Sequence, residues 1–267
     1  MTPGARLAFA SVGLATIITA CGGSGSGGSA APQPSLSSSA RAVTVVALGD
    51  SDATGIGDSS GRGWVGRYGA LLHDKLASPV TVNNEAVEGK TSDQLRSELS
   101  NDASLRQSIA TAKVILIGIG GADLNAGDDA LAASRCKGRA CYTKVLHAFA
   151  TNINAIAAEV HHLAPGALLR AMSLPNAYPG AGSAIPAFIT ADVSRYEVVA
   201  VRAAVCNAMR SNGGRCVDVV TAFNGKSADS DAYASGLMTK DPCCYPSAKG
   251  QEAIARLLIA SGVPAAQ

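Results

Sequence analysis

Short apolar runs alternate along the chain with longer segments in which apolar residues recur at helical spacing. The runs contain few polar residues, which is typical of strands buried on both faces of a sheet. We therefore expect strands over Val43–Leu48, Val80–Asn83, Lys113–Ile119, Ala167–Met172 and Arg215–Val219.

The segments between these runs favour helices. In the first of them, Trp64, Tyr68, Leu72 and Leu76 recur at every fourth position, so one face of a helix would be apolar. The pattern predicts helices over Gly63–Leu76, Ser92–Leu99, Lys144–Leu163, Ala191–Arg210 and Ser247–Ile259, and irregular chain over Asp128–Tyr142 and Pro175–Pro186.

This alternation of strands and helices predicts an α/β fold with one parallel sheet of five strands. In such sheets, ligands bind at the loops that follow the carboxyl ends of the strands. The pattern contains no internal repeat and no sign of a second folded domain. The loops expected to carry the function begin at Gly49, Asn84, Gly120, Ser173 and Thr221.

Residues 1–20 have the pattern of an export signal, because Arg6 precedes an apolar stretch, Leu7–Ile18. This stretch is shorter than the roughly 20 apolar residues of a membrane span. Residues 18–21, ITAC, resemble the lipobox of bacterial lipoproteins, in which the cysteine, here Cys21, becomes the lipidated N-terminus. The alternative is a secretory signal followed by an incidental cysteine.

A low-complexity stretch, GGSGSGGSAAPQPSLSSS, follows over residues 22–39 and has almost no apolar side chains to bury. We expect residues 21–40 to be a lipidated cysteine with a flexible linker, and residues 41–267 to fold. The protein would be exported to the cell envelope, either held by lipid on the outer face of the cytoplasmic membrane or secreted, and monomeric. A formal net charge of +2 without a dense basic patch gives no indication of nucleic-acid binding.

Seven cysteines also favour export, because disulfides persist in oxidising compartments. No Cys-x-x-Cys motif occurs and the histidines are not arranged around the cysteines, so the sequence does not indicate a zinc site. Local pairing predicts two disulfides, while the adjacent pair near the C-terminus would form a vicinal disulfide, bond elsewhere or remain as thiols. The predicted pairs are Cys136 with Cys141 and Cys206 with Cys216, and the open pair is Cys243 and Cys244.

The first strand ends in a turn, Gly49-Asp50-Ser51, that presents a single serine. Such a serine is either an exposed nucleophile or a residue that only caps the turn. In the second loop, Gly89 precedes a predicted helix, where its N–H and the Ser51 N–H would form an oxyanion hole. The alternative is an ordinary loop glycine. The third loop, Gly120–Asp123, is a Gly-Gly turn that ends in an acid.

These loops resemble the sequence blocks of the GDSL, or SGNH, hydrolases, which are serine esterases and lipases. The resemblance spans most of residues 43–261 and implies a flavodoxin-like three-layer α/β/α domain that needs no cofactor or metal. It also implies that Ser51 is the nucleophile and Gly89 an oxyanion donor. The matching blocks are Gly49–Ser51, Asn84–Ser92, Gly120–Asp123 and, after the position of the catalytic histidine, Pro246–Gly250.

The chain also departs from the family pattern at the positions that activate the serine. Asp52 replaces the usual leucine after the serine, and Ala122 replaces the oxyanion asparagine. Tyr245 stands where the catalytic histidine belongs, and Pro242 stands at the spacing of the triad aspartate, one residue after Asp241. The candidate catalytic residues are therefore Ser51, Gly89, Asp123, Asp241 and Tyr245.

The sequence does not show which residue replaces the missing histidine as the base. A free phenol such as that of Tyr245 is roughly 0.1% ionised at pH 7, which makes it a poor base. Lys90 or Lys240 would serve if desolvated, and Asn125 would supply an amide in place of Ala122. The histidines are expected to be surface or packing residues away from the site: His73, His147, His161 and His162.

Two functions follow from this pattern. The first is an exported serine hydrolase of acyl (carboxylic) esters, acting on a small ester, a lipid or an acetylated glycan through Ser51 and an atypical relay. The second is an inactive relative that binds a glycan, lipid or protein of the cell envelope.

Overall fold

The computed structural model of the chain describes residues 42–180 and 188–265, all of which belong to one compact unit. The predicted export signal, Cys21 and the predicted linker lie outside these residues. No helix in the described part of the chain is both long and apolar enough to cross a membrane.

The centre of the fold is a parallel sheet of five strands in the order β2-β1-β3-β4-β5. This is the strand order of flavodoxin-like folds, in which ligands bind where the order reverses, beside the first strand. The α/β fold class and the five-stranded parallel sheet are thus confirmed. The strands are β1 (Val43–Gly49), β2 (Val80–Asn84), β3 (Val114–Gly118), β4 (Leu168–Met172) and β5 (Arg215–Val217).

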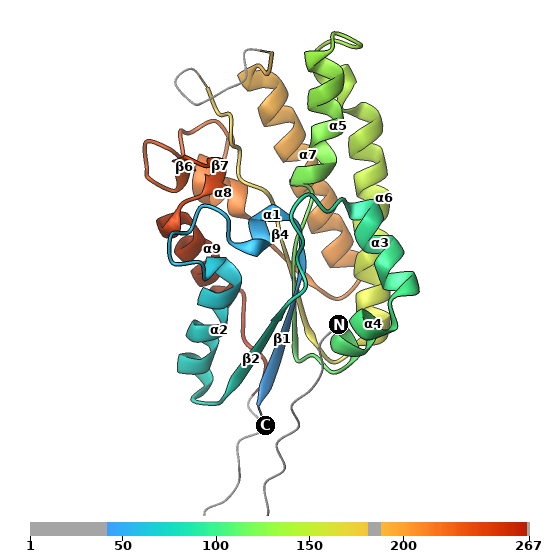
Figure 1. The fold of residues 1–267 in the computed structure, drawn as a ribbon, viewed down its shortest axis with the longest axis vertical. Coiled ribbons are helices and arrows are strands. Elements are labelled where there is room, and N and C mark those ends of the chain that lie inside the picture. Colours follow the sequence, from blue (N-terminus) through green and yellow to red (C-terminus); the bar gives the residue numbers. More distant parts are fainter. Residues whose placement is uncertain (1–41, 181–187, 266–267) are drawn as a thin grey trace, which may run out of the picture. The chain divides into compact units, whose positions relative to one another are not determined.

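Helices cover both faces of the sheet, so the fold has three layers (Figure 1). On one face lie α2 (Gly63–Leu76) and α9 (Ala248–Ala260), and on the other α3 (Ser92–Asn101), α4 (Ala103–Ala110), α6 (Thr143–Leu163) and α7 (Ala191–Ser211). Shorter elements occupy the connections: α1 (Ser51–Thr54), α5 (Gly121–Ala132), η1 (Gly138–Cys141), α8 (Val219–Asn224) and an antiparallel hairpin, β6 (Met238–Lys240) with β7 (Cys243–Pro246).

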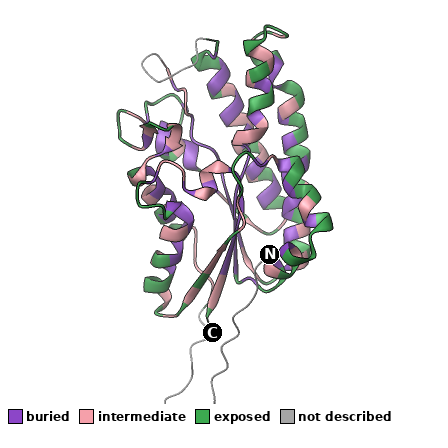
Figure 2. Ribbon diagram, viewed as in Figure 1, coloured by how far each residue is buried: buried purple, intermediate pink, exposed green. Residues whose placement is uncertain are grey.

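Strand β1 is buried on both faces because its side chains alternate between the two layers. Val46 and Leu48 join the apolar cluster beneath α3, α6 and α7, whereas Val45 and Ala47 join the cluster beneath α2 and α9. All four side chains are fully buried. Purple segments mark the buried middle of the sheet in Figure 2. Burial on both faces is the reason that this strand reads as one uninterrupted apolar run.

Helix α4 was not predicted. It begins at Asp102, whose carboxylate accepts hydrogen bonds from the N–H groups of Ser104 at 2.8 Å and Leu105 at 3.1 Å. The helix buries only Leu105 and Ile109, so the apolar period is too short to be recognised.

The prediction of irregular chain over Asp128–Tyr142 was wrong at its beginning, because α5 continues to Ala132. This helix buries only Leu124 and Gly127, which leaves little apolar period in the sequence. The fifth strand also ends two residues earlier than predicted, since Asp218 caps α8 by accepting a hydrogen bond from the N–H of Thr221 at 3.1 Å.

The short hairpin β6–β7 was not predicted, because its strands have three and four residues and flank Pro242. Of the predicted loop, Pro175–Gly180 has no helix or strand, and the remainder lies outside the described residues.

Three disulfides are present in the structure. Two join the pairs predicted from local spacing, Cys136–Cys141 beside η1 and Cys206–Cys216 between α7 and β5. The third joins the neighbouring residues Cys243 and Cys244 in β7, which selects the vicinal disulfide among the three alternatives.

Candidate active site

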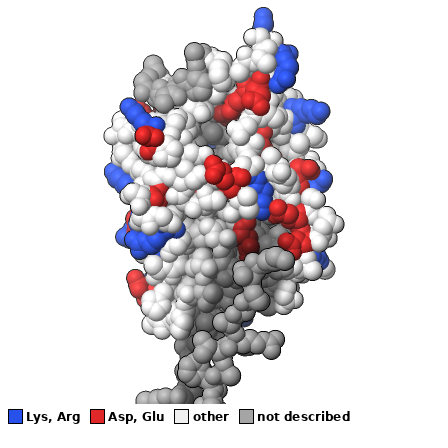
Figure 3. All heavy atoms as spheres, in the orientation of Figure 1, with Lys and Arg blue, Asp and Glu red and all other residues white. Residues whose placement is uncertain are grey.

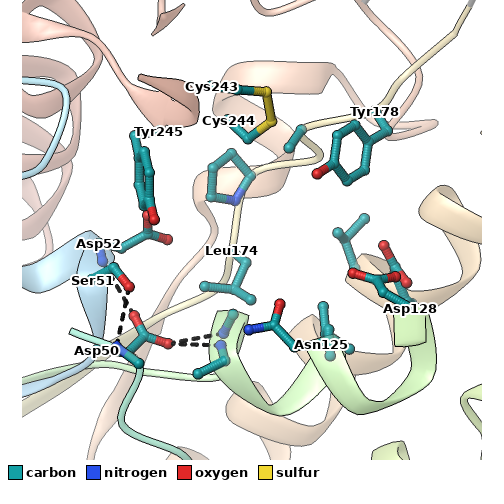
Figure 4. A pocket seen from close by; sticks show the side chains of 18 residues that line it. Asp50, Ser51, Asp52, Asn125, Asp128, Leu174, Tyr178, Cys243, Cys244 and Tyr245 are labelled. Atoms are coloured by element: carbon teal, nitrogen blue, oxygen red, sulfur yellow. Dashed lines mark hydrogen bonds between the residues drawn. A yellow bond between two sulfur atoms is a disulfide. The ribbon is translucent and has the colours of Figure 1, made fainter. Parts of the chain in front are cut away.

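The turn after β1 holds Ser51 at the carboxyl edge of the sheet. Asp50 caps the short helix α1, and its Oδ2 accepts a hydrogen bond from the N–H of Gly120 at 3.0 Å. The same oxygen accepts a hydrogen bond from the N–H of Gly121 at 2.9 Å (Figure 4). Gly49 allows the strands to approach, because a Cβ there would lie 2.0 Å from the carbonyl oxygen of Gly118. The loops after β1 and β3 are therefore fixed to one another beneath the serine.

Burial raises the pKa of Asp50 to about 6, against the effect of four backbone N–H hydrogen bonds that favour the carboxylate. Those hydrogen bonds stabilise the negative charge of the Asp50 carboxylate, whose burial would otherwise be unfavourable.

The backbone N–H of Gly89, in the loop after β2, donates a hydrogen bond to Ser51 Oγ at 3.5 Å. Gly89 has a φ of 75°, in the left-handed region that favours glycine, and no atom lies within 4 Å of the place where a Cβ would be. A donor beside the serine oxygen is close to where the oxyanion of an acyl adduct would form.

Asp123 does not line the pocket around Ser51. Its carboxylate accepts hydrogen bonds from Ser92 N–H at 2.9 Å and Ser92 Oγ at 2.5 Å, and Asn152 donates to the same hydroxyl at 3.1 Å. Asp123 therefore fixes the start of α3, just after the loop that carries Gly89. Burial raises its pKa, and the Ser92 hydrogen bonds oppose that rise.

Ser51 opens into a pocket with a volume of about 440 Å³ (Figure 4). The loops after β1, β2, β3 and β4, the helices α5 and α7 and strand β7 form its wall. Its lining includes Asp50, Asp52, Gly89, Ala122, Asn125, Asp128, Leu174, Tyr178, Glu197, Cys243, Cys244 and Tyr245.

The two candidate catalytic residues near the C-terminus, Asp241 and Tyr245, differ in whether they reach the pocket. Tyr245 lines the pocket, on the same side as Ser51 and Asp52 (Figure 4). Asp241 is exposed and is not part of the lining. Its backbone N–H donates to Thr239 Oγ1 at 3.2 Å, within the turn of the β6–β7 hairpin.

Gln251 of α9 holds this hairpin against the serine turn. It is fully buried, and its amide nitrogen donates to the carbonyl oxygens of Ile56 at 3.0 Å and Pro246 at 3.3 Å. One side chain thereby joins the segment after Ser51 to the residue after Tyr245.

Asp52 and Asp50 are both acidic groups on the Ser51 side of the pocket. Desolvation and, to a smaller extent, repulsion by the Asp50 carboxylate raise the pKa of Asp52 to about 8. A carboxyl group with such a pKa exchanges its proton near neutral pH, as the histidine of a triad does.

The other bases considered from the sequence do not reach the pocket. Lys90 is nearly buried and its ammonium donates to Glu98 Oε2 at 2.6 Å, while Lys240 is exposed and outside the lining. The exposed Asn125 does line the pocket. The four histidines are exposed on α2 and α6 and none of them lines the pocket: His73, His147, His161 and His162.

Comparison with known proteins assigns this geometry to a family. Residues 47–253 match the model of the GDSL-like Lipase/Acylhydrolase family. The chain belongs to that family. The family and its structural neighbours support a hydrolase that acts on esters.

The match to an individual curated protein covers less of the chain than the match to the family model. The uncharacterised protein YpmR of Bacillus subtilis (strain 168) is 37% identical over 83 residues, which are 31% of this chain and 32% of that protein. The match thus spans about a third of the length of this curated relative.

Two solved structures share the fold. The lipase Lip_vut3 from a goat rumen metagenome superposes with a TM-score of 0.70 at 19% identity, over 84% of this chain and 100% of that chain. Axe2, an acetyl xylan esterase from Geobacillus stearothermophilus, gives a TM-score of 0.59 at 17% identity, over 82% and 93%.

Two acidic residues that line the pocket, Asp128 and Glu197, were not predicted from the sequence. A signal for Glu197 existed, because it lies on α7 midway between Val193 and Val201, two buried residues of the apolar face. A glutamate at such a position is almost never fully buried without a partner. Asp128 had no comparable signal, since α5 was itself only partly predicted.

Proposed function

We propose that this chain is an exported hydrolase of acyl (carboxylic) esters that uses Ser51 as its nucleophile. The observation that carries the proposal is the Gly89 N–H, 3.5 Å from Ser51 Oγ, at the wall of a pocket of about 440 Å³. Family membership supports the reaction class. The pattern of the first 20 residues supports export, and the three disulfides are consistent with an oxidising compartment.

In this reaction, Ser51 Oγ attacks the ester carbonyl carbon, and the carbonyl oxygen becomes an oxyanion that accepts a hydrogen bond from the Gly89 N–H. Removal of one such donor typically costs a factor of about 10²–10³ in rate. Ala122 cannot contribute a side-chain donor here, so the remaining candidate donors are backbone N–H groups and the amide of Asn125, which lines the pocket.

Asp52 accepts the serine proton, directly or through one water, and Tyr245 lies beside it as the phenol that replaces the histidine (Figure 4). As the tetrahedral adduct collapses, the alcohol leaves with the proton held by Asp52. Water then attacks the acyl–serine carbonyl carbon, with Asp52 accepting its proton. Collapse of this second adduct breaks the bond to Ser51 Oγ, which takes the proton back from Asp52, and the acid is released. The substrate is a small acyl ester, a lipid ester or an acetylated glycan.

A fluorophosphonate probe tests this proposal, because it forms an adduct only with an activated serine. We expect labelling of the purified domain and hydrolysis of p-nitrophenyl acetate, both abolished by Ser51→Ala. Ser60→Ala is the matched control, since Ser60 lies on the exposed turn before α2 and outside the pocket. Absence of a Ser51-dependent adduct together with absence of ester hydrolysis would exclude the enzyme.

The second candidate is an inactive relative that binds an envelope glycan, lipid or protein. It is favoured by one observation, that no histidine, lysine or arginine lines the pocket in the described part of the chain. Loss of a triad base leaves only about 10³–10⁴-fold catalysis over water. Binding of an envelope component by a chain that shows no adduct would support this alternative.

A further inference from the structure

A disulfide between neighbouring residues forms part of the pocket wall. Cys243 and Cys244 both line the pocket that contains Ser51, and both are half-buried. Figure 4 shows the bond between their sulfur atoms at the wall, with Tyr245 to one side of it and Tyr178 to the other. A group bound in the pocket would therefore contact this part of strand β7.

Cys244 is an extra residue in the β6–β7 hairpin. Thr239 of β6 pairs with Tyr245 of β7. The next residue along β6, Lys240, pairs with Cys243, which leaves one residue of β7 without a partner in the ladder. Such a β-bulge redirects the side chain that follows it, because successive side chains of a strand point to opposite faces. The bulge therefore determines on which side of the hairpin Tyr245 lies.

The backbone of Cys244 has a conformation that normally requires glycine. Its φ is 83°, in the left-handed region where a side chain is unfavourable. Glycine is the usual residue at this place in a bulge of this kind. Strained backbone persists only where the surrounding structure holds it. In this hairpin, the covalent bond to the preceding residue, Cys243, supplies that constraint.

The chain after Tyr245 is fixed by the loop that follows Ser51. A Cβ at Gly57 would lie 2.6 Å from the carbonyl oxygen of Pro246 and 3.0 Å from the Cβ of Tyr245, so the two segments are in direct contact. The amide of Gln251 donates a hydrogen bond to each segment. Since the disulfide constrains the strand just before Tyr245, this wall is held on both sides of the tyrosine.

The disulfide and the loop after β4 give the pocket an apolar part. That loop contributes Leu174, Pro175 and Ala177 to the lining. In contrast, lysine and arginine side chains are interspersed with acidic ones over the outer face shown in Figure 3. Apolar surface favours an apolar ligand group, so the acyl chain of an ester is suited to this part of the pocket.

We propose that the Cys243–Cys244 disulfide determines which acyl groups the pocket accepts, because it holds the bulge, and with it Tyr245, in one conformation. A wall that cannot rearrange discriminates between groups by size, whereas a wall that can repack accepts several sizes. The proposal rests on the proposed function for the identity of the ligand as an ester. The dependence of Tyr245 on the disulfide is independent of turnover.

The competing explanation is a disulfide that only stabilises the hairpin. A bond between adjacent residues removes little entropy from the unfolded chain, so its contribution to stability by this route is small. The two explanations differ in the effect of Cys244→Gly. Glycine adopts a φ of this sign without a disulfide, so this substitution restores the bulge and the position of Tyr245 without restoring the covalent bond.

The first test follows Tyr245 by fluorine NMR of the purified protein labelled with fluorotyrosine, with Tyr245→Phe to assign the signal. We expect the double serine variant, Cys243→Ser with Cys244→Ser, to shift or broaden that signal. Cys243→Ser with Cys244→Gly should restore it. Cys206→Ser with Cys216→Ser removes a disulfide outside the pocket lining and is the matched control, which should leave the signal unchanged.

An unchanged Tyr245 signal in the double serine variant would overturn the proposal. A signal that stays shifted in the variant with Cys244→Gly would do the same, because the bulge conformation would then not be what positions the tyrosine. Circular dichroism confirms that each variant is folded.

The second test compares kcat/KM for the p-nitrophenyl esters of acetate, butyrate and octanoate. We expect the ratio between the best and the poorest ester to fall about threefold or more in the double serine variant, and to recover in Cys243→Ser with Cys244→Gly. An unaltered ratio would overturn the selection by size. Absence of hydrolysis by the unmodified protein would reject the hydrolase proposal and the selection of acyl groups together, whereas the fluorine signal separately decides the positioning of Tyr245.

Discussion

Gly89 combines a left-handed backbone with open space at its Cβ position, so its substitution separates conformation from packing. In Gly89→Ala, the unfavourable φ costs about 1–2 kcal/mol or moves the N–H away from Ser51 Oγ. We expect kcat for a short p-nitrophenyl ester to fall about 10- to 100-fold. Gly166→Ala, where a Cβ also meets nothing and φ is not positive, should leave kcat unchanged. An unaltered rate in Gly89→Ala would remove this N–H from the mechanism.

The pKa of Asp52 gives the proposed base a distinct pH profile. Because the proton acceptor must be ionised, kcat/KM should rise with pH through about 8 and level off above it. Asp52→Asn should abolish this rise and lower the plateau by about 10²–10⁴. Tyr245→Phe should retain the rise near pH 8. A rise at another pH that disappears in Tyr245→Phe would instead identify Tyr245 as the base.

Glu197 makes the stability of the fold depend on pH with a definite sign. Burial raises its pKa from 4.5 to about 8, so the folded state holds a proton that the unfolded state releases between these values. The stabilising effect is complete below the unfolded pKa and is lost as the pH rises through the folded pKa. Glu197→Gln should therefore raise the free energy of unfolding on the order of 2 kcal/mol at pH 9 and little at pH 4. Urea titrations at both pH values, with Asp129→Asn as control, measure the difference; an equal effect at both would contradict it.

At the scale of elements, we expect two of the three disulfides to have different roles. Cys206–Cys216 joins α7 to β5 across 10 residues, whereas Cys243–Cys244 closes the shortest loop possible, within the strand that carries Tyr245. The entropy removed from the unfolded chain grows with loop length. The first bond should therefore act mainly on stability, and the second mainly on the shape of the pocket wall.

Variants in which both cysteines of one disulfide are replaced by serine test these different roles. Replacing Cys206 and Cys216 should lower the free energy of unfolding by roughly 3 kcal/mol in urea titrations, with little effect on ester hydrolysis. Replacing Cys243 and Cys244 should give the opposite result, with hydrolysis reduced and stability nearly unchanged. Comparable loss of stability in both variants would show that the vicinal bond has no special relation to the pocket.

At the scale of the whole molecule, the five strands were predictable because both faces of the sheet are covered, whereas their order in the sheet comes only from the structure. Residues such as Val45 and Leu48 then have to be apolar regardless of which layer they face. The serine turn and the Gly89 loop were predictable for a related reason: each is a glycine-containing connection that directly follows a strand.

The opposite wall of the pocket was not predictable, since it depends on helix α5, which has few buried residues, and on the packing of α7 against it. Glu197 and Asp128 are 69 positions apart in the sequence, and only tertiary structure brings them to one cavity. Likewise, only the fold reveals that Lys90 is engaged by Glu98 and that Asp241 lies outside the pocket. Local patterns therefore predicted the Ser51 side of the pocket, and long-range packing determined the opposite side.

The location of the whole protein depends on residues before the folded part. If Cys21 is lipidated, the hydrolase is held at the outer face of the cytoplasmic membrane by its lipid, with residues 22–39 as a spacer. Cys21→Ala should then move the protein from the membrane fraction to the soluble exported fraction, while its hydrolysis of soluble esters stays the same. Deleting residues 25–36 is the matched control, because it shortens the spacer, keeps Cys21 and should leave the protein membrane-bound. Retention of Cys21→Ala in membranes after a salt wash would instead indicate that the folded domain itself binds an envelope component.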